Sequence, residues 1–143
     1  MKSVHWLAGL LAVLGGMLAG PLHAADLALD VAPLRSDKGT LNISLYKGAE
    51  GFKDEAKAFL QAKLPAKPGA LRHVFTGLAA GRYAAIVYHD ENGDGKMNRR
   101  FGMIPEEGYG VSNNPKLVGP PSFDACAFDV LETGSTQQIQ VFY

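Results

Sequence analysis

The stretch that decides the fold runs from Arg82 to His89 and reads RYAAIVYH. A strand with one face in water alternates apolar and polar side chains, but here both alternating sets are largely apolar. Such a strand has to be covered on both faces. We therefore predict an interior strand of a sheet, with further structure packed against each side of it.

Segments with one apolar face lie on both sides of this strand in the sequence. Apolar residues recur at every second position over residues 27–32, 41–46, 126–131 and 138–143, which is the pattern of half-buried strands. We also predict a strand over residues 71–75. A short polar loop separates the first two, so we expect them to pair as an antiparallel hairpin. Six or seven strands in a chain of this size predict an all-β fold, namely a β-sandwich.

One segment between the strands has a different period. Apolar residues from Phe52 to Leu64 recur at helical spacing, and the charged residues among them fall mostly on the opposite face. We predict one short inserted helix here, which is amphipathic, ends at Pro65 and packs on the sheet.

The N-terminal residues have the pattern of a secretory signal peptide. Lys2 precedes the apolar run Trp6–Ala19, and Ala24 is the kind of small residue that signal peptidase prefers. The run is shorter than the roughly 20 residues that span a bilayer, and no basic flank follows it. We predict that residues 1–24 are removed, that residues 25–143 form a single domain without a transmembrane segment, and that the mature protein is periplasmic or secreted.

Composition narrows the possible partners. The chain has 14 basic and 14 acidic residues, so it lacks the basic field that nucleic acid requires, and we exclude nucleic acid as a partner. A protein or a small molecule remains as the partner. Cys126 is the only cysteine and lies in an alternating apolar pattern, which favours a small buried side chain over a disulfide between two chains.

Residues 90–124 show no periodicity, and ten of them, six Gly and four Pro, are turn-forming residues. A loop of this length in a compact domain is usually functional or disordered. Apolar residues such as Phe101 and Tyr109 are spread through it, which is unusual for a disordered linker. We expect a long loop that is ordered against the sandwich, with a short strand near Met97–Phe101.

The first part of this loop has the residues of a calcium-binding loop. Calcium takes six to eight oxygen ligands, and alternating Asp and Asn residues with a Gly at the sharp turn wrap a short backbone around one ion. Phe101 occupies position twelve, where an EF-hand has a bidentate Glu, and Glu106 and Glu107 are the nearest carboxylates able to fold back. We predict calcium as the cofactor, bound by Asp90, Asn92, Asp94, the carbonyl of Lys96, and Asn98.

Two other interpretations of nearby residues are open. The pairs Asn92-Gly93 and Asp94-Gly95 are also ordinary turn residues, suited to positive φ at a hairpin tip. His73 and His89 form a transition-metal site, with Cys126 or an acid, if their strands are neighbours.

The second part of the loop indicates a function without a metal. Its aromatic residues in a Gly-rich segment are typical of an accessory module that binds a ligand or a protein. No nucleophile elbow, phosphate-binding loop or dinucleotide-binding motif is present, so we assign no catalytic residue and expect no enzymatic activity. The predicted ligand or partner contacts are Phe101, Tyr109, Ser112, Asn113 and Asn114.

Several motifs in this order resemble those of a family of small exported bacterial proteins, the domain-of-unknown-function family 2141. They are FTGLAAGRYA at residues 75–84, HDENGDGK at 89–96, GMIPEEGYG at 102–110, SNN at 112–114 and GPPSF at 119–123. The resemblance implies an exported β-sandwich with no established activity. The turn GLAAGRY is also similar to one in prealbumin-like sandwiches, so the expected fold is prealbumin-like or immunoglobulin-like.

Overall fold

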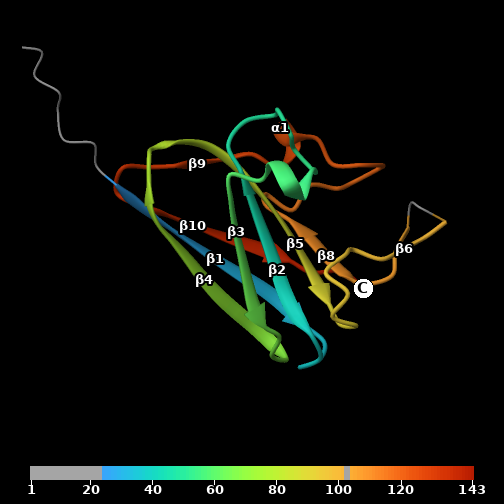
Figure 1. Cartoon of the computed structure of the whole chain (residues 1–143). Helices are drawn as coiled ribbons and strands as arrows, with labels where there is room; N and C mark the ends of the chain where they lie inside the picture. Colours follow the sequence, from blue (N-terminus) through green and yellow to red (C-terminus); the bar gives the residue numbers. More distant parts are fainter. Residues whose placement is uncertain (1–23, 102–103) are drawn as a thin grey trace, which may run out of the picture.

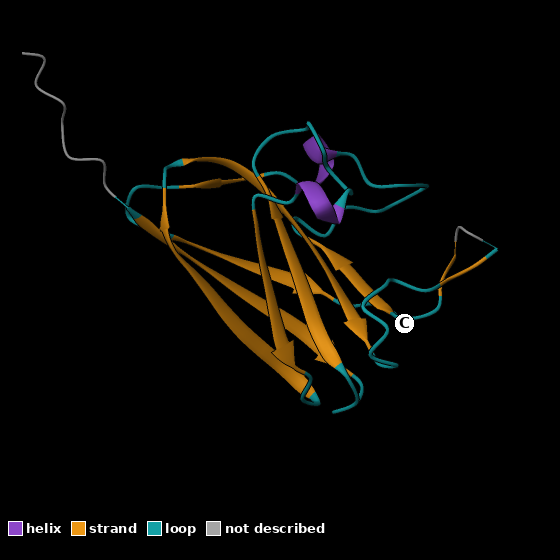
Figure 2. Cartoon of the chain, in the orientation of Figure 1, coloured by secondary structure: helices purple, strands orange, loops and turns teal. Residues whose placement is uncertain are grey.

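The computed structural model describes residues 24–101 and 104–143, and this part is built mainly of strands (Figure 1, Figure 2). The smaller sheet has the order β10-β1-β4, formed by Ser135–Gln140, Ala25–Leu34 and Gly69–Leu78. The larger sheet has the order β3-β2-β5-β8, formed by Leu60–Pro65, Thr40–Tyr46, Gly81–Asp90 and Gly108–Val111. The prediction of an all-β sandwich is confirmed.

Strand β5 is the interior strand that its sequence predicts. It pairs antiparallel with β2 on one side, and with β8 and β9 (Phe128–Val130) on the other. Residues from Tyr83 to Asp90 are buried except Ile86, which is partly exposed. Tyr83 and Val87 belong to the core between the sheets, whereas Ala84 and Ile86 pack in a second apolar cluster. Both faces of β5 are therefore covered, as its two apolar sets require.

The main core takes one face of each sheet. Because the side chains of a strand alternate between faces, every second residue of β1, β2 and β5 enters this core. A Leu-to-Ala change in such a core typically costs about 2–5 kcal/mol of stability. The most deeply buried aliphatic residues are Leu27, Leu29, Val31, Leu41, Ile43, Leu45, Leu78, Val87, Val130 and Ile139.

The predicted hairpin between the first two strands is wrong. β1 lies in the middle of the smaller sheet, antiparallel to β4 and parallel to β10, whereas β2 lies in the larger sheet between β3 and β5. The chain crosses from one sheet to the other between Leu34 and Thr40. Both strands bury their Leu-rich faces in the same core, β1 from the smaller sheet and β2 from the larger one.

The predicted helix over Phe52–Leu64 is also wrong. The segment forms a single 3₁₀ turn, η1 (Glu55–Lys57), followed by strand β3. In β3 the partly buried Leu60, Ala62 and Leu64 alternate with exposed polar residues, so a period of two also fits the sequence. Pairing with six residues of β2 satisfies backbone groups that would otherwise stand open at the edge of the sheet.

The short α-helix of the described residues is α1 (Phe123–Cys126), which ends at the residue where we predicted that a strand begins. The side chain of Ser122 caps it by accepting from the amide of Ala125. Cys126 therefore ends a helix instead of lying in a strand, and β9 starts two residues later. The prediction that Cys126 is buried is confirmed.

The long loop contains three strands. β6 (Arg99–Arg100) and β7 (Ile104–Pro105) form a small hairpin, which confirms the expected short strand in this region. β8 was missed because Gly108 and Gly110 hide its alternation. A Cβ at Gly108 would overlap the ring of Tyr143, and one at Gly110 would overlap the carbonyl oxygen of Gln140. Glycine is thus required where the C-terminal segment crosses β8 closely.

Candidate functional site

A cavity of about 620 Å³ lies on the outer face of the larger sheet and is called the outer cavity below. Its floor comes from Ser44 and Tyr46 of β2, Ile86 and Tyr88 of β5, and Tyr109 of β8. The register explains this grouping, because Ser44 pairs with Ile86 and Tyr88 pairs with Tyr109. Paired residues of neighbouring strands project from the same face of a sheet.

Three connecting segments supply the walls of the outer cavity. Lys53 and Glu55 come from the segment between β2 and β3, and the second wall is formed around the hairpin of β6 and β7. The third wall comes from the segment before α1. All three lie beyond the sandwich core, so their residues are free to serve binding. The second and third walls contain Met97, Arg99, Pro105, Leu117, Gly119, Pro120 and Pro121.

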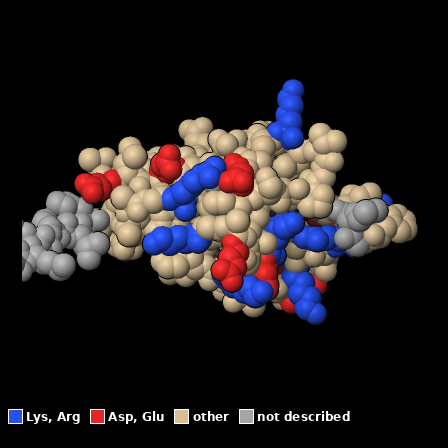
Figure 3. All heavy atoms as spheres, turned by 90° about the horizontal axis from the view of Figure 1, so that it is seen from above, with Lys and Arg blue, Asp and Glu red and all other residues tan. Residues whose placement is uncertain are grey.

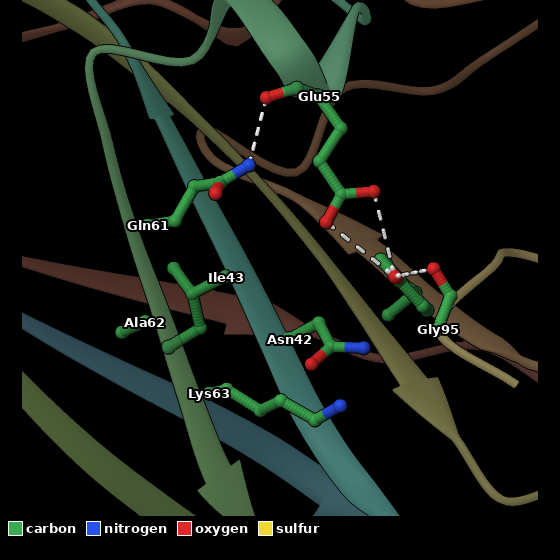
Figure 4. Close-up of a pocket in the computed structure, with 8 residues that line it drawn as sticks. Asn42, Ile43, Glu55, Gln61, Ala62, Lys63 and Gly95 are labelled. Atoms are coloured by element: carbon green, nitrogen blue, oxygen red, sulfur yellow. Dashed lines mark hydrogen bonds between the residues drawn. The ribbon is translucent and has the colours of Figure 1, made fainter. Parts of the chain in front are cut away.

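A second cavity of about 240 Å³ adjoins the first and shares Glu55 and Tyr88 with it (Figure 4). The hydroxyl of Tyr88 donates to the carbonyl oxygen of Gly95 at 3.2 Å and lies 3.5 Å from both carboxylate oxygens of Glu55. Gln61 also donates its side-chain amide to the carbonyl of Glu55 at 2.7 Å. Figure 4 shows Glu55 reaching from its turn toward Gly95, so these residues tie three segments together.

The tyrosines that line the outer cavity are neutral hydrogen-bonding groups at ordinary pH. Burial, and then the negative charge of Glu55, raise the pKa of Tyr88 to about 12. Burial is also the largest cause that raises the pKa of Tyr46 and of Tyr109 above the usual value. The charged groups of the lining are two cations, Lys53 and Arg99, and one anion, Glu55. An apolar lining with phenolic hydroxyls and net positive charge suits an amphipathic anion.

Only one of the five predicted ligand contacts lines the outer cavity, and this is Tyr109. Phe101 is 84 % exposed and does not line it. Ser112 is fully buried, where it accepts from the amide of Ala85 at 2.8 Å and donates to the carbonyl of Cys126. Asn113 donates to the carbonyl of Ala125, and Asn114 bonds to the backbone of β10 at Gln138 and Gln140.

The cavity residues of β2 and β5 were missed because the sequence presents them only as strand residues. Tyr46 and Tyr88 are even-numbered residues, whereas the residues of β2 and β5 that face the main core are odd-numbered. A tyrosine on the strand face opposite the main core indicates that this second face is also buried. Lys53 and Arg99 carry no comparable signal, because only the folding of their segments places them together at one cavity.

The predicted calcium loop is wrapped around the side chain of Asp90, which is fully buried. One carboxylate oxygen of Asp90 accepts from the amide of Gly93 at 2.8 Å, and the other accepts from the amide of Gly95 at 2.9 Å. Both glycines have positive φ, 74° and 72°, which side-chain-bearing residues rarely adopt. The positive φ expected at the turns Asn92-Gly93 and Asp94-Gly95 is thus present in the structure.

Asn92 and Asp94 form local bonds in the same loop. The amide of Asp94 donates to the side chain of Asn92 at 3.0 Å, and the amide of Lys96 donates to the carboxylate of Asp94 at 2.8 Å. This bond to Lys96 is the main reason that the pKa of Asp94 is lowered. Within residues 24–101 and 104–143, no three His, Cys, Asp or Glu side chains come together as a metal-binding group.

Glu107 contacts the C-terminal end of this loop, at Asn98. Its Oε2 accepts from the amide of Asn98 at 3.2 Å, and the residue is 6 % exposed. The chain therefore folds back at one of the two carboxylates named from the sequence, whereas Glu106 is an exposed residue paired with Arg100. The carbonyl of Gly95, within the loop, also accepts from Tyr88 on the floor of the outer cavity.

The two histidines of the described residues lie in different sheets, His73 on β4 and His89 on β5, so the condition for a shared metal site is not met. The Nε2 of His89 lies 2.8 Å from the carbonyl oxygen of Lys38, and its Nδ1 lies 2.7 Å from the hydroxyl of Tyr143. A carbonyl only accepts, so Nε2 carries the proton and Tyr143 donates to Nδ1. His89 thus anchors the C-terminal residue to β5.

The fold and the site define a class: a β-sandwich module with an aromatic cavity on the outer face of one sheet. A family model described as an uncharacterized protein conserved in bacteria, domain of unknown function 2141, matches residues 29–140. The chain belongs to this family, so the resemblance seen in its motifs is confirmed. No curated protein and no solved structure matches the chain. Among the described residues, no helix has the length and apolarity to cross a membrane.

Proposed function

We propose that this protein is an exported, non-enzymatic accessory module that binds an amphipathic small anion in the outer cavity. The observation that carries the proposal is the cavity of about 620 Å³ itself, which joins three tyrosines of neighbouring strands to Lys53 and Arg99. Its volume lies within the range of about 300–1,000 Å³ that is usual for small-molecule sites. The leader-like N-terminal sequence supports export.

The chemistry of the lining selects the class of ligand. Tyr46, Tyr88 and Tyr109 offer flat apolar surfaces for a ring or a chain, and their hydroxyls offer hydrogen bonds. Lys53 and Arg99 are both exposed at the walls, where they stay hydrated and can meet an anionic group at the mouth. A ligand with an apolar body and one carboxylate or sulfonate group would match the tyrosine surfaces and the two cations.

The proposal is tested with a fluorescent aromatic sulfonate, 1-anilinonaphthalene-8-sulfonate, titrated into the folded protein. We expect saturable fluorescence with one site per chain, and weaker binding of the neutral analogue N-phenyl-1-naphthylamine. Gly119→Trp, which places a large ring at the wall, should abolish binding. Val118→Trp is the matched control, because Val118 is fully exposed and does not line the cavity. Equal binding by both variants would disprove the site.

A second pair of variants tests the charge. Arg99→Gln removes a cation of the lining and should weaken binding of the sulfonate about two- to fivefold, the usual size of an exposed ionic contact. Arg100→Gln, at the next residue, removes a cation that is paired with Glu106 and lies outside the cavity. It should leave the affinity unchanged. An equal effect of both variants would point to general attraction of the anion to the protein surface.

A further inference from the structure

One carboxylate oxygen stands out by its lack of a partner. Among the residues that the structure describes, Oε1 of Glu107 is the buried side-chain oxygen or nitrogen that finds no hydrogen bond. The residue is 6 % exposed, so water does not substitute easily for the missing partner. Burying an unpaired carboxylate is expensive in free energy, and such groups are normally paired with a cation or coordinate a metal.

A second buried carboxylate lies at the end of the same strand pair. His89 of β5 pairs with Gly108 of β8, so Asp90 and Glu107 are the residues that directly adjoin the last pair of this antiparallel register. Continuing the register by one residue would put both side chains on the same face of the sheet. Asp90 is fully buried and Glu107 nearly so. Like charges in this arrangement repel each other unless a cation lies between them.

The neighbouring loop supplies further oxygen donors. The bonds from Gly93 and Gly95 to Asp90 wrap the chain around that carboxylate, and the amide of Asn98 reaches Glu107. The loop is therefore closed at its start by Asp90 and at its end by Glu107. Asn92, Asp94 and Lys96 lie between these two ends in the sequence and are exposed, so their oxygens are accessible to an ion.

We propose that the Asp90–Asn98 loop and Glu107 together form a site for Ca²⁺, in which Glu107 takes the role of the bidentate acid that the loop itself lacks at Phe101. All donors are oxygens, which favours a hard cation over zinc or copper. The three carboxylates, Asp90, Asp94 and Glu107, exceed the charge of one Ca²⁺ ion by one. Asp90, Asp94 and Glu107 do not form a three-carboxylate group in the described part of the chain, so the side chains of Asp94 and Glu107 would have to rotate to ligate the ion.

Calcium binding is measured on the wild-type protein by isothermal titration with CaCl₂ and by melting in CaCl₂ or in EGTA. We expect half-saturation at about 0.1–1 mM, the range of extracellular modules, and a higher melting temperature with calcium. No heat of binding and identical melts would overturn the proposal. Equal affinity for Mg²⁺ would overturn the assignment to calcium. Neither result depends on a ligand of the outer cavity.

Glu107→Gln separates an ion ligand from a buried structural acid. It keeps the shape of the side chain and an oxygen for the amide of Asn98, but it removes the charge. We expect calcium affinity to fall at least tenfold and the calcium-dependent rise in melting temperature to disappear. Glu106→Gln is the matched control, because Glu106 is exposed and paired with Arg100. It should bind calcium like the wild type.

Asp94→Asn provides a second test, because Asp94 is exposed and the amide oxygen of an Asn can still accept from the amide of Lys96. We expect it to weaken calcium binding while the melting temperature in EGTA stays at the wild-type value. A Glu107→Gln variant that is more stable than the wild type in EGTA and still binds calcium normally would show that Glu107 is a buried acid without a role in the ion site.

Discussion

Tyr109 of β8 and Phe142 near the C-terminus exchange two backbone hydrogen bonds of 2.9 Å each and thereby join the C-terminal segment to the larger sheet. The same segment follows β10 of the smaller sheet, so the chain links both sheets along one side. Gly108 and Gly110 flank Tyr109 and allow this close approach. The contact also orients Tyr109, whose ring belongs to the floor of the outer cavity.

Replacing Gly110 by Ala should destabilise the protein by about 1–3 kcal/mol, because the added methyl group overlaps the carbonyl oxygen of Gln140 and forces the two strands apart. Urea denaturation measures the loss. Gly119→Ala is the control, since a Cβ at Gly119 meets nothing within 4 Å. Equal stability of the two variants would mean that the C-terminal crossing is not tight in solution.

Ser112→Ala should cost about 1–3 kcal/mol of stability, because it leaves the buried amide of Ala85 and the carbonyl of Cys126 without the hydroxyl that joins them. The measurement is the free energy of unfolding in guanidinium chloride. Thr136→Ala on the exposed side of β10 serves as the comparison and should change stability little. If Ser112 instead contacts a ligand, its loss would reduce binding of the sulfonate probe without reducing stability.

Glu91 should contribute to the acid sensitivity of the fold. Hydrogen bonds from Arg35 are the largest cause that lowers the pKa of Glu91 from 4.5 to about 2. A carboxylate whose pKa is lowered by folding stabilises the protein above its unfolded pKa, and this contribution is lost as the pH falls from about 4.5 to about 2. Because Arg35 is half exposed, we expect about 1 kcal/mol.

The measurement for Glu91 is the free energy of unfolding between pH 7 and pH 2, for the wild type and for Glu91→Gln. The variant should lose less stability over this interval than the wild type. It should still lose some, because the pKa of Asp30 is also lowered, chiefly by its hydrogen bond with Arg72. Parallel pH curves for the two proteins would show that the pair with Arg35 contributes nothing in solution.

The thiol of Cys126 should resist labelling in the native protein. Its side chain is buried, and burial raises the pKa of the thiol above the usual value, so little of the reactive thiolate forms. We expect Ellman's reagent at pH 8 to react only after guanidinium chloride has unfolded the chain. Rapid labelling of the folded protein would contradict this burial.

The errors in the expected fold arose where a local sequence pattern is compatible with more than one structure. The second half of Phe52–Leu64 is compatible with both a helical and a strand period. It forms a strand because it pairs with the edge of β2, which would otherwise be open. The hairpin between β1 and β2 was inferred from a short loop, but a loop length does not tell which sheet each strand joins. β8 has too few side chains to show any period, since two of its four residues are glycine.

The sequence by itself determined the all-β class, the covered strand β5, the family and the turn chemistry of the Asp90–Asn98 loop, because these depend on local alternation and on residue types at short spacing. The partners of each strand, the outer cavity and the burial of Glu107 against Asn98 depended on the tertiary structure. They arise from register and from contacts between residues far apart in the chain. A local pattern cannot specify them, since a shift of one residue would turn every side chain to the other face.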